Sequence, residues 1–255
     1  MTRVGLIGYG RTGKIVAEEL LKEKDTHLEW VLRRTNTDEG EYAGELLGLH
    51  KEAGKIYCLE KLNMANFFAE HPVDIIVDFS NHSTVNRYHK EIQSTNIGLI
   101  SAISNYPDDE LAIIHDVAKT NPVLYSPNIT LGINFLIVIS EVLQQIAPWA
   151  DIEIIEEHFR NKPDVSGTAL RIADILNLDT DKQVNSIRIG GIVGKHEVIF
   201  GLPNQTIRLT HETNNRAAFG QGIIFGMRYL IGKPAGMYTM DKIIKEKFAN
   251  SFTEN

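Results

Sequence analysis

The chain has 255 residues, of which 43% are hydrophobic and 23% are charged, and its formal net charge at pH 7 is −7. This length suits one large domain or two small ones, and the composition excludes a disordered chain. With 33 acidic and 26 basic residues, the protein has no overall attraction for nucleic acid or for an anionic membrane. Its one cysteine, Cys58, excludes an intrachain disulfide and a thiolate metal cluster.

The N-terminus enters a predicted strand within a few residues and has no signal-peptide pattern. The longest apolar runs, such as Ile133–Ile139, are shorter than the ~20 residues that a membrane span needs. We therefore expect a cytoplasmic protein that does not bind membranes.

The first half of the chain alternates short apolar runs with segments of helical periodicity. Val16 and Leu20, for example, share one face of a predicted helix. In chain order we expect a strand at Val4–Ile7, a helix at Lys14–Lys24, a strand at Leu28–Leu32, a loop with a short helix at Thr35–Lys55, a strand at Val73–Phe79, a helix at Ser83–Ser94, a strand at Ile97–Ile103, a helix from Pro107 and a strand at Pro122–Ser126. Such alternation predicts a parallel sheet with crossover helices.

The pattern changes after Asn128. The expected elements there are a helix at Ile133–Ala147, a strand at Asp151–Glu156, a helix at Thr168–Leu176, three antiparallel strands at Ser186–Ile192, His196–Phe200 and Gln205–His211, and a helix at Phe219–Gly232. The predicted fold class is α/β: a Rossmann-type doubly wound parallel sheet plus a C-terminal α+β domain with a mixed or antiparallel sheet. We assign residues 1–127 and 217–255 to the first domain and residues 128–216 to the second.

A glycine-rich turn, Gly8-Tyr9-Gly10-Arg11-Thr12-Gly13, follows the first strand and opens the first helix. In a dinucleotide-binding site the first glycine makes the turn, the second lets a pyrophosphate approach backbone N–H groups, and the third lets the helix pack closely on the strand. The helix N-terminus then faces the anion. The alternative is a tight turn without a ligand.

Arg33 lies twenty residues beyond Gly13 and is followed by Arg34. A site that prefers NAD usually has an acidic residue here, which binds the ribose 2′-hydroxyl. Two guanidinium groups suit the 2′-phosphate of NADPH instead. We expect NADPH to be preferred over NADH, the alternative being a solvated pair of arginines at a strand end.

A second polar segment, from Glu157 to Thr168, leads into a helix. Ser166, Gly167 and Thr168 would lie at the helix N-terminus, where backbone N–H groups and two hydroxyls bind an anion such as a carboxylate. His158 and Lys162 flank this point. They are suited to supply a proton after hydride addition, although a charged loop before a capped helix is also common without catalysis.

These segments resemble the dihydrodipicolinate reductase (4-hydroxy-tetrahydrodipicolinate reductase) family over nearly the whole chain. The most specific shared motif is His158…Lys162…Ser166-Gly167-Thr168-Ala169. The other shared segments are the glycine-rich turn, Val77-Asp78-Phe79-Ser80, Pro127-Asn128-Ile129-Thr130-Leu131-Gly132, Asp151-Ile152-Glu153-Ile154-Ile155-Glu156, Arg188-Ile189-Gly190-Gly191-Ile192-Val193-Gly194 and Lys233-Pro234-x-Gly236-x-Tyr238.

The resemblance implies a two-domain fold and a homotetramer built through the C-terminal sheet, with residues 128–216 forming the substrate-binding and oligomerisation domain. It also implies that His158 is the acid/base residue and Lys162 the proton donor. The substrate-binding residues carried over are Phe159, Ser166, Gly167 and Thr168. The cofactor-binding residues carried over are Gly8, Tyr9, Gly10, Arg11, Thr12, Gly13, Arg33, Arg34, Phe79, Ser80, Ser101, Ala102, Ile103, Ser126, Pro127, Asn128 and Ile129.

The chain departs from the family pattern at three places. Phe159 stands where the family has a second histidine, and the run Lys162–Ser166 is one residue shorter. Ser101-Ala102-Ile103-Ser104 replaces a Gly-Thr-Thr-Gly segment that binds nicotinamide. All three departures fall at the expected reacting centre, where a placement error of 1 Å can cost ~100-fold in rate.

We therefore expect an NADPH-dependent reductase of a cyclic imine dicarboxylate, with NADH as the second choice of cofactor. The leading function is conversion of 4-hydroxy-tetrahydrodipicolinate to tetrahydrodipicolinate in lysine (diaminopimelate) biosynthesis. An enzyme of the same fold acting on another imino or amino acid is the first alternative, favoured by Phe159 and Ile103. A non-catalytic NADP(H)-binding regulator is the second. The scattered histidines predict no metal site.

Overall fold

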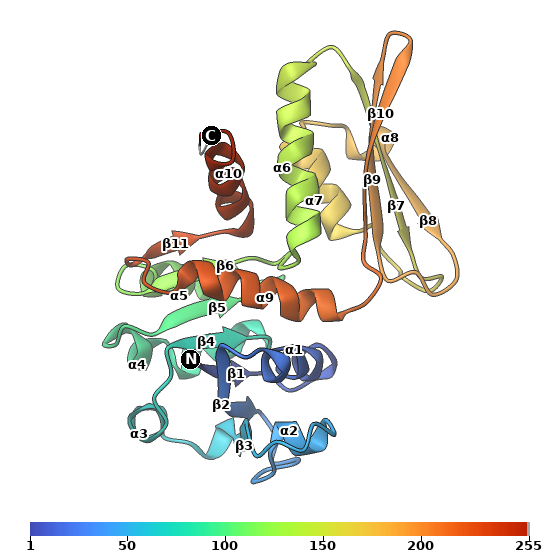
Figure 1. Cartoon of the computed structure of the whole chain (residues 1–255). Coiled ribbons are helices and arrows are strands. Elements are labelled where there is room, and N and C mark those ends of the chain that lie inside the picture. Colours follow the sequence, from blue (N-terminus) through green and yellow to red (C-terminus); the bar gives the residue numbers. More distant parts are fainter. Residues whose placement is uncertain (254–255) are drawn as a thin grey trace. The chain divides into compact units, whose positions relative to one another are not determined.

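The computed structural model describes residues 1–253, which form two compact units. The first unit comprises Met1–Thr130 and Ala217–Ile243, and the second comprises Leu131–Arg216 and the residues from Ile244 onward (Figure 1). The sequence-based division placed the segment after Ile243 in the first domain, and the structure groups it with the second unit instead. No helix among residues 1–253 is both long enough and apolar enough to span a membrane.

The first unit is built on a seven-stranded sheet in which every paired strand is parallel. Its strand order is β11-β6-β5-β4-β1-β2-β3. The strands are β1 (Thr2–Ile7), β2 (Thr26–Arg33), β3 (Lys55–Cys58), β4 (Ile75–Asp78), β5 (Gly98–Ser101), β6 (Pro122–Tyr125) and β11 (Gly236–Tyr238). This order and direction confirm the predicted doubly wound sheet.

Helices cover both faces of this sheet (Figure 1). They are α1 (Arg11–Lys22), α2 (Ala43–Leu46), α3 (Met64–Glu70), α4 (His89–Gln93), α5 (Asp108–Val117), α9 (Ala217–Leu230) and the first residues of α10 (Met240–Asn250), with 3-10 turns η1 (Leu59–Lys61) and η2 (His82–Arg87). Side chains that alternate along a strand separate into two clusters: Val77 packs with α1 and α9, whereas Ile76 packs with α3 and α4. Period-two burial is therefore what makes this sheet two-sided.

Two parts of the first unit differ from the sequence-based expectation. β3, which pairs with β2, was not predicted. Its four residues are too few to show a strand period on their own. The single helix predicted over Ser83–Ser94 is divided into η2 and α4. Tyr88 separates them, because its buried hydroxyl donates a hydrogen bond of 2.6 Å to Asp78 and its backbone leaves the helical region.

The second unit packs helices on one face of a four-stranded sheet with the order β10-β9-β7-β8 (Figure 1). The elements are α6 (Leu131–Ile146), β7 (Asp151–His158), α7 (Gly167–Ile175), α8 (Thr180–Gln183), β8 (Val184–Arg188), β9 (Lys195–Leu202) and β10 (Gln205–Glu212). Ile133 and Ile137 of α6 and Ile172 of α7 pack on Ile154 and Phe200 of the sheet.

The sheet of the second unit corrects two predictions. The three strands predicted after Asn185 do not form one antiparallel group: β8 pairs only with β7, in parallel, because the chain crosses over through α7 and α8, and β7 lies between β8 and β9. β7 also continues to His158 instead of ending at Glu156, so the histidine expected on a loop lies on a strand. Its register partner is Arg188.

The third glycine of the turn provides a stability test. A Cβ atom on Gly13 would lie 2.0 Å from the Gly8 carbonyl oxygen, whereas one on Gly10 meets nothing within 4 Å. We expect Gly13→Ala to lower the free energy of unfolding by about 1–3 kcal/mol or more, since the backbone must move apart. Gly10→Ala should change it by less than about 1 kcal/mol. Urea unfolding of both variants checks this, and equal stabilities would contradict it.

Candidate active site

The carboxyl ends of β1, β2 and β4 border a cavity of about 300 Å³. β1 lies between β2 and β4, where the strand order reverses, and this is where open parallel sheets bind nucleotides. The sequence-predicted residues that line the cavity are Gly8, Tyr9, Gly10, Arg33, Arg34, Phe79 and Ser80. The structure thus brings together the glycine-rich turn, the two arginines and the end of β4.

The backbone of the glycine-rich turn has the form that its expected role requires. Gly8 has φ +100°, and a Cβ atom there would lie 2.7 Å from the Phe79 backbone across the gap between β1 and β4. Gly10 precedes α1 without a side-chain cap, and the first turn of α1 contains no acidic residue. The first N–H groups of this helix are therefore free of a capping side chain beside an open position, which fits a pyrophosphate.

The two arginines differ in their surroundings. Arg33 forms an ion pair with Asp38 and lies with its guanidinium carbon 5.8 Å from the Tyr9 ring centroid. Arg34 is exposed, and no carboxylate of residues 1–253 pairs with it. Of the two guanidinium groups, that of Arg34 is therefore the one without a carboxylate partner among these residues.

The remaining residues predicted to bind cofactor follow β4, β5 and β6. The Ser80 hydroxyl donates to Asp78 at 2.5 Å, and the Ser126 hydroxyl donates to the Asn128 carbonyl at 2.7 Å. Ser101 is fully buried and shares a hydrogen bond of 2.9 Å with Tyr106, and Ile129 is only 1% exposed. The Ser101 and Ile129 side chains are thus buried within the protein, and their cofactor contacts stay predictions.

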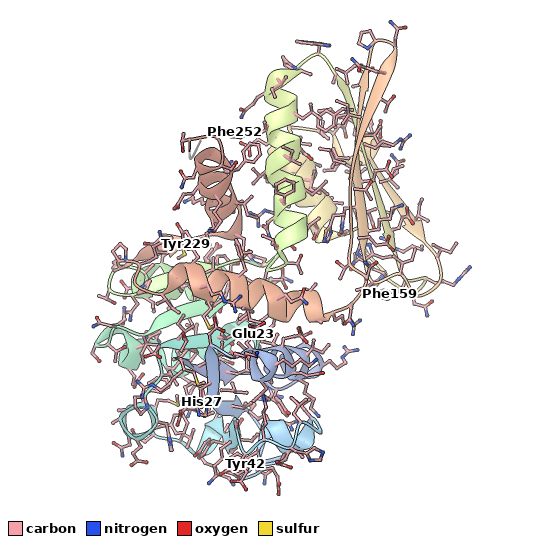
Figure 2. All side chains as sticks on the ribbon, in the orientation of Figure 1. Glu23, His27, Tyr42, Phe159, Tyr229 and Phe252 are labelled. Carbon is pink, nitrogen blue, oxygen red and sulfur yellow. The ribbon has the colours of Figure 1, made fainter. Side chains whose placement is uncertain are left out.

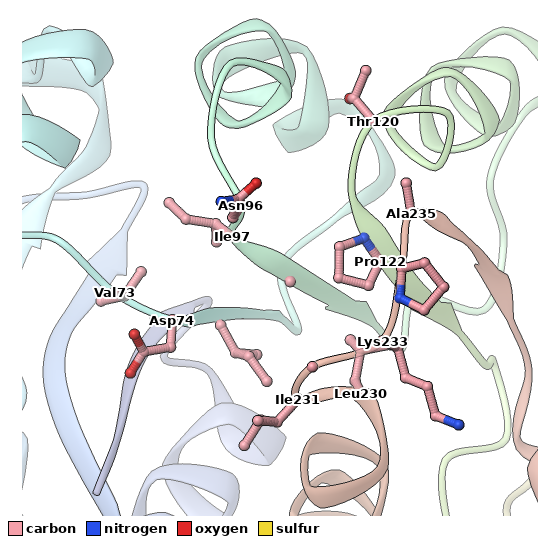
Figure 3. Close-up of a pocket in the computed structure, with 14 residues that line it drawn as sticks. Val73, Asp74, Asn96, Ile97, Thr120, Pro122, Leu230, Ile231, Lys233 and Ala235 are labelled. Carbon is pink, nitrogen blue, oxygen red and sulfur yellow. The ribbon is translucent and has the colours of Figure 1, made fainter.

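A second cavity, of about 530 Å³, lies at the opposite ends of the strands of the same sheet (Figure 3). It is bordered by the amino ends of β4, β5 and β6 and by the segment that follows α9, with Asp74 and Lys233 as its charged residues. Asp74 accepts a hydrogen bond of 2.7 Å from the Arg3 backbone. Ligands of parallel sheets bind at the carboxyl ends of the strands, so the smaller cavity is the candidate nucleotide site.

In the second unit, a buried polar cluster lies where β7 and β8 end and α7 begins. Its centre is Glu156, whose side chain is 0% exposed. Five hydrogen bonds reach its carboxylate: from His158 Nδ1 at 2.5 Å, the Ser166 N–H at 3.1 Å, the Ser186 hydroxyl at 2.5 Å, and Arg188 Nη1 and Nη2 at 2.8 and 2.6 Å. Burial alone would raise the pKa of Glu156, but these donors, Arg188 foremost, lower it to about 2.

His158 shares this cluster with a second histidine. The His196 ring lies edge-on to the His158 ring at 5.3 Å between centroids, and its Nε2 atom is 2.8 Å from the Ser166 hydroxyl. Ser166 is also the N-cap of α7, since its hydroxyl accepts from the Ala169 N–H. Burial, assisted by the positive charge of a protonated His158, lowers the pKa of His196 to about 4. His196 is therefore neutral at physiological pH.

The loop between β7 and α7 contains the other predicted residues. Lys162 is half-buried and donates its backbone N–H to the Phe159 carbonyl at 3.1 Å. The Phe159 side chain is 40% exposed (Figure 2). Gly167 is exposed and Thr168 half-buried in the first turn of α7. His158, Lys162 and the Ser-Gly-Thr turn thus lie between the end of β7 and the first turn of α7, and their roles stay predictions.

The sequence-based prediction missed four residues of this cluster: Glu156, Ser186, Arg188 and His196. A signal for Glu156 was present. Ile152, Ile154, Glu156 and His158 alternate along β7 and face the core, so a carboxylate stands at an apolar position and needs a partner. No such signal identified Arg188 as that partner, because it lies 32 residues away in the chain.

Among residues 1–253, no group of three or more His, Cys, Asp or Glu side chains is arranged to hold a metal ion.

Comparisons with known proteins cover most of both units. Residues 2–129 match the sequence model described as dihydrodipicolinate reductase, N-terminus, and residues 129–244 match the one described as dihydrodipicolinate reductase, C-terminus. A 4-hydroxy-tetrahydrodipicolinate reductase of Caldanaerobacter subterraneus is 33% identical over 194 residues, which cover 68% of this chain and 77% of that protein. The enzyme of the same name from Buchnera aphidicola is 28% identical and covers 97% of this chain and 98% of its own length.

Solved structures of similar fold include a dihydrodipicolinate reductase and an amine dehydrogenase. A dipicolinate-bound dihydrodipicolinate reductase from Paenisporosarcina has a TM-score of 0.77 at 19% identity, covering 94% of this chain and 97% of that one. An amine dehydrogenase from Mycobacterium smegmatis has a TM-score of 0.62 at 12% identity and covers 94% of this chain and 95% of its own. At these identities the likeness establishes the fold.

The low pKa of His196 predicts an acid-sensitive stability. The unfolded residue takes up a proton near pH 6.5, but the folded one does so only near pH 4. Between these values the unfolded state binds more protons, so stability falls as the pH falls, by about 3 kcal/mol in total. Urea unfolding between pH 7 and pH 4 measures this.

The matched variants separate His196 from other histidines. We expect His196→Gln to flatten the pH dependence in that range, while His115→Gln, on the exposed surface of α5, leaves it unchanged. An identical slope in the wild type and His196→Gln would disprove the assignment.

Proposed function

Because the chain belongs to the dihydrodipicolinate reductase family, we propose that it reduces 4-hydroxy-tetrahydrodipicolinate to tetrahydrodipicolinate, in lysine biosynthesis, with hydride from NADPH. The observation that carries the proposal is the arrangement at α7: His158, held by Glu156, lies with the Lys162 loop beside a helix N-terminus capped by Ser166. An imine dicarboxylate needs a site for an anion and a source of one proton, and both are present here.

The residues that would hold the nucleotide are those of the smaller cavity. The N–H groups at the start of α1, beyond Gly10, are suited to the pyrophosphate, and Arg34 is suited to the 2′-phosphate. When bound, the nicotinamide supplies the hydride. The fold and the family establish a nicotinamide-nucleotide enzyme, and the preference for NADPH over NADH rests on Arg34.

The proton is handled by the second unit. The Nδ1–H of His158 donates to a carboxylate, which leaves Nε2 as the atom that faces a reactant. Ser166, Gly167 and Thr168 are suited to bind one substrate carboxylate through the first N–H groups and hydroxyls of α7. Conversion of the 4-hydroxy substrate also removes its 4-hydroxyl group as water, and the unsaturated ring that remains accepts the hydride. Hydride addition leaves negative charge on that ring. Lys162 supplies the compensating proton, and His158 acts as acid/base partner.

A second candidate function is reduction of a different imino or amino acid. The exposed phenyl ring of Phe159 favours it, because an apolar side chain replaces a hydrogen-bonding one next to His158. Ile103, which is half-buried after β5, acts in the same direction at the nucleotide site. The homotetramer and the cytoplasmic location expected from the sequence both stay predictions.

The direct test mixes the protein with NADPH and freshly made 4-hydroxy-tetrahydrodipicolinate and follows the absorbance of the reduced cofactor. We expect steady consumption that requires both. His158→Ala should lower kcat by about 100-fold or more, as for lost general acid–base catalysis. His115→Ala, on the surface of α5, should leave it unchanged. Demonstrable NADPH binding without consumption would overturn the substrate assignment and favour the second candidate.

Cofactor preference is tested by reversing one charge. Arg34→Glu should shift the ratio of kcat/KM for NADPH and NADH toward NADH, by about tenfold or more, since an Arg–phosphate pair becomes a repulsion. Lys24→Glu makes the same reversal beyond the far end of α1 and should not move the ratio. An unchanged ratio in Arg34→Glu would refute the role of this residue.

A further inference from the structure

We propose that Glu156 and Arg188 are positioning residues of this reaction: the buried carboxylate holds His158 in one tautomer, and the guanidinium holds the shortened Lys162 loop at the start of α7. The inference rests on the proposed function, because it gives the two proton-handling groups their places. It assigns a role to residues that lie behind the predicted substrate site.

The carboxylate of Glu156 is saturated with donors. Oε1 accepts from Ser166 N–H, the Ser186 hydroxyl and Arg188 Nη2, while Oε2 accepts from His158 Nδ1 and Arg188 Nη1. An ionised carboxylate only accepts hydrogen bonds, so the 2.5 Å contact requires the proton to be on Nδ1. The neutral imidazole is thereby confined to the tautomer whose Nε2 lone pair is free.

The opposite side of the ring is kept clear by a glycine. Gly194 is buried just before β9, and a Cβ atom there would lie 3.0 Å from His158 Nε2. Any larger residue would therefore cover the atom that the tautomer leaves available. The Glu156 contact occupies Nδ1, and the absence of a side chain at Gly194 leaves space at Nε2. Nε2 is therefore the ring nitrogen that is available for proton transfer.

Arg188 connects this carboxylate to the loop. Its Nε donates to the Lys162 carbonyl at 3.2 Å, and its Nη2 donates to the Asp164 carbonyl at 2.9 Å. The same guanidinium binds both oxygens of Glu156. One planar group thus ties the backbone on either side of Pro163 to the end of β7, which fixes the origin of the Lys162 side chain in a loop that is one residue short.

A lysine cannot replace this arrangement. An ammonium group neutralises Glu156 as a point charge, but it lacks the rigid fork that reaches two carbonyls and a carboxylate at once. Arg188→Lys therefore separates charge compensation from loop placement. Glu156→Gln keeps the size of the side chain and removes the charge that selects the tautomer, since an amide both donates and accepts.

The first experiment uses the whole protein without substrate. Nitrogen-15 NMR of histidine-labelled protein, at a pH where the ring is neutral, should show His158 as the Nδ1–H tautomer alone. Glu156→Gln should give a mixture or the Nε2–H form. Glu157→Gln, whose partner is Lys195 on the other face of β7, should leave the tautomer as in the wild type. An Nε2–H tautomer in the wild type, or no change in Glu156→Gln, would overturn the proposal.

The second experiment measures kcat in paired variants. We expect Glu156→Gln to lower kcat by about 10-fold to 100-fold, and to cause no further loss when His158 is already alanine. Arg188→Lys should keep the Nδ1–H tautomer but lower kcat, with no further loss in a Lys162→Ala background. Losses that multiply in the double variants would show a merely structural role.

The two experiments distinguish failure of the proposed function from failure of the positioning roles. If the wild type does not consume the substrate, the proposed function fails, while the tautomer measurement still tests Glu156. If Glu156→Gln does not fold, the wild-type tautomer and Arg188→Lys, which preserves the buried charge pair, decide the proposal. A wild-type tautomer on Nδ1 with an unimpaired Arg188→Lys would retain the Glu156 role and overturn that of Arg188.

Discussion

Parallel strand pairing is the constraint on which both candidate sites depend. Two parallel neighbours end at the same edge of a sheet, so the residues that follow them become neighbours even when the chain between them is long. In the first unit this places Gly8, Arg33 and Phe79 around one cavity. In the second unit the only parallel pair among the described strands, β7 and β8, sets His158 directly opposite Arg188.

The buried carboxylate of Glu156 shows how such an edge becomes a specific site. A lone buried carboxylate is strongly destabilising, and its net contribution to folding depends on complete hydrogen bonding. Here the donors come from three segments: His158 on β7 itself, Ser186 and Arg188 on β8, and Ser166 directly before α7. The contribution of Glu156 is therefore to specify the structure, because its hydrogen-bond network allows only one placement of β7, β8 and the start of α7 relative to one another.

Two of the three departures from the family pattern lie in segments that other residues hold in place. The loop between Lys162 and Ser166 is shorter, but Arg188 and Glu156 hold both of its ends. Ser101 is used inside the protein, against Tyr106. Phe159 remains the exposed change, with its ring outside the polar network. The hydrogen bonds that hold His158 and the Lys162 loop are thus formed within the second unit, and Phe159 is the departure whose side chain is exposed.

Local sequence was sufficient to predict the helices and strands with a clear hydrophobic period, and the motifs whose residues are close together in the chain. Period and glycine spacing predicted a strand at Val4–Ile7, a glycine turn and a helix at Lys14–Lys24, which the structure has as β1, the turn and α1 with ends shifted by up to three residues. The start of α7 at the Ser-Gly-Thr turn also followed from the local sequence. Tertiary contacts decided the rest. β8 is parallel to β7 because the chain crosses over between them. The Tyr88–Asp78 hydrogen bond separates η2 from α4. The short strand β3 forms by pairing with β2.

The candidate site divides in the same way. His158, Lys162 and Ser166-Gly167-Thr168 are close in the chain, so their spacing was informative. Their partners lie far away in the chain: Arg188 is 26 residues from Lys162, and His196 is 30 residues from Ser166. A sequence shows that a carboxylate stands at a buried strand position, but only the folded chain determines which distant donor satisfies it, because hydrogen bonds act over about 3 Å of space and not along the chain.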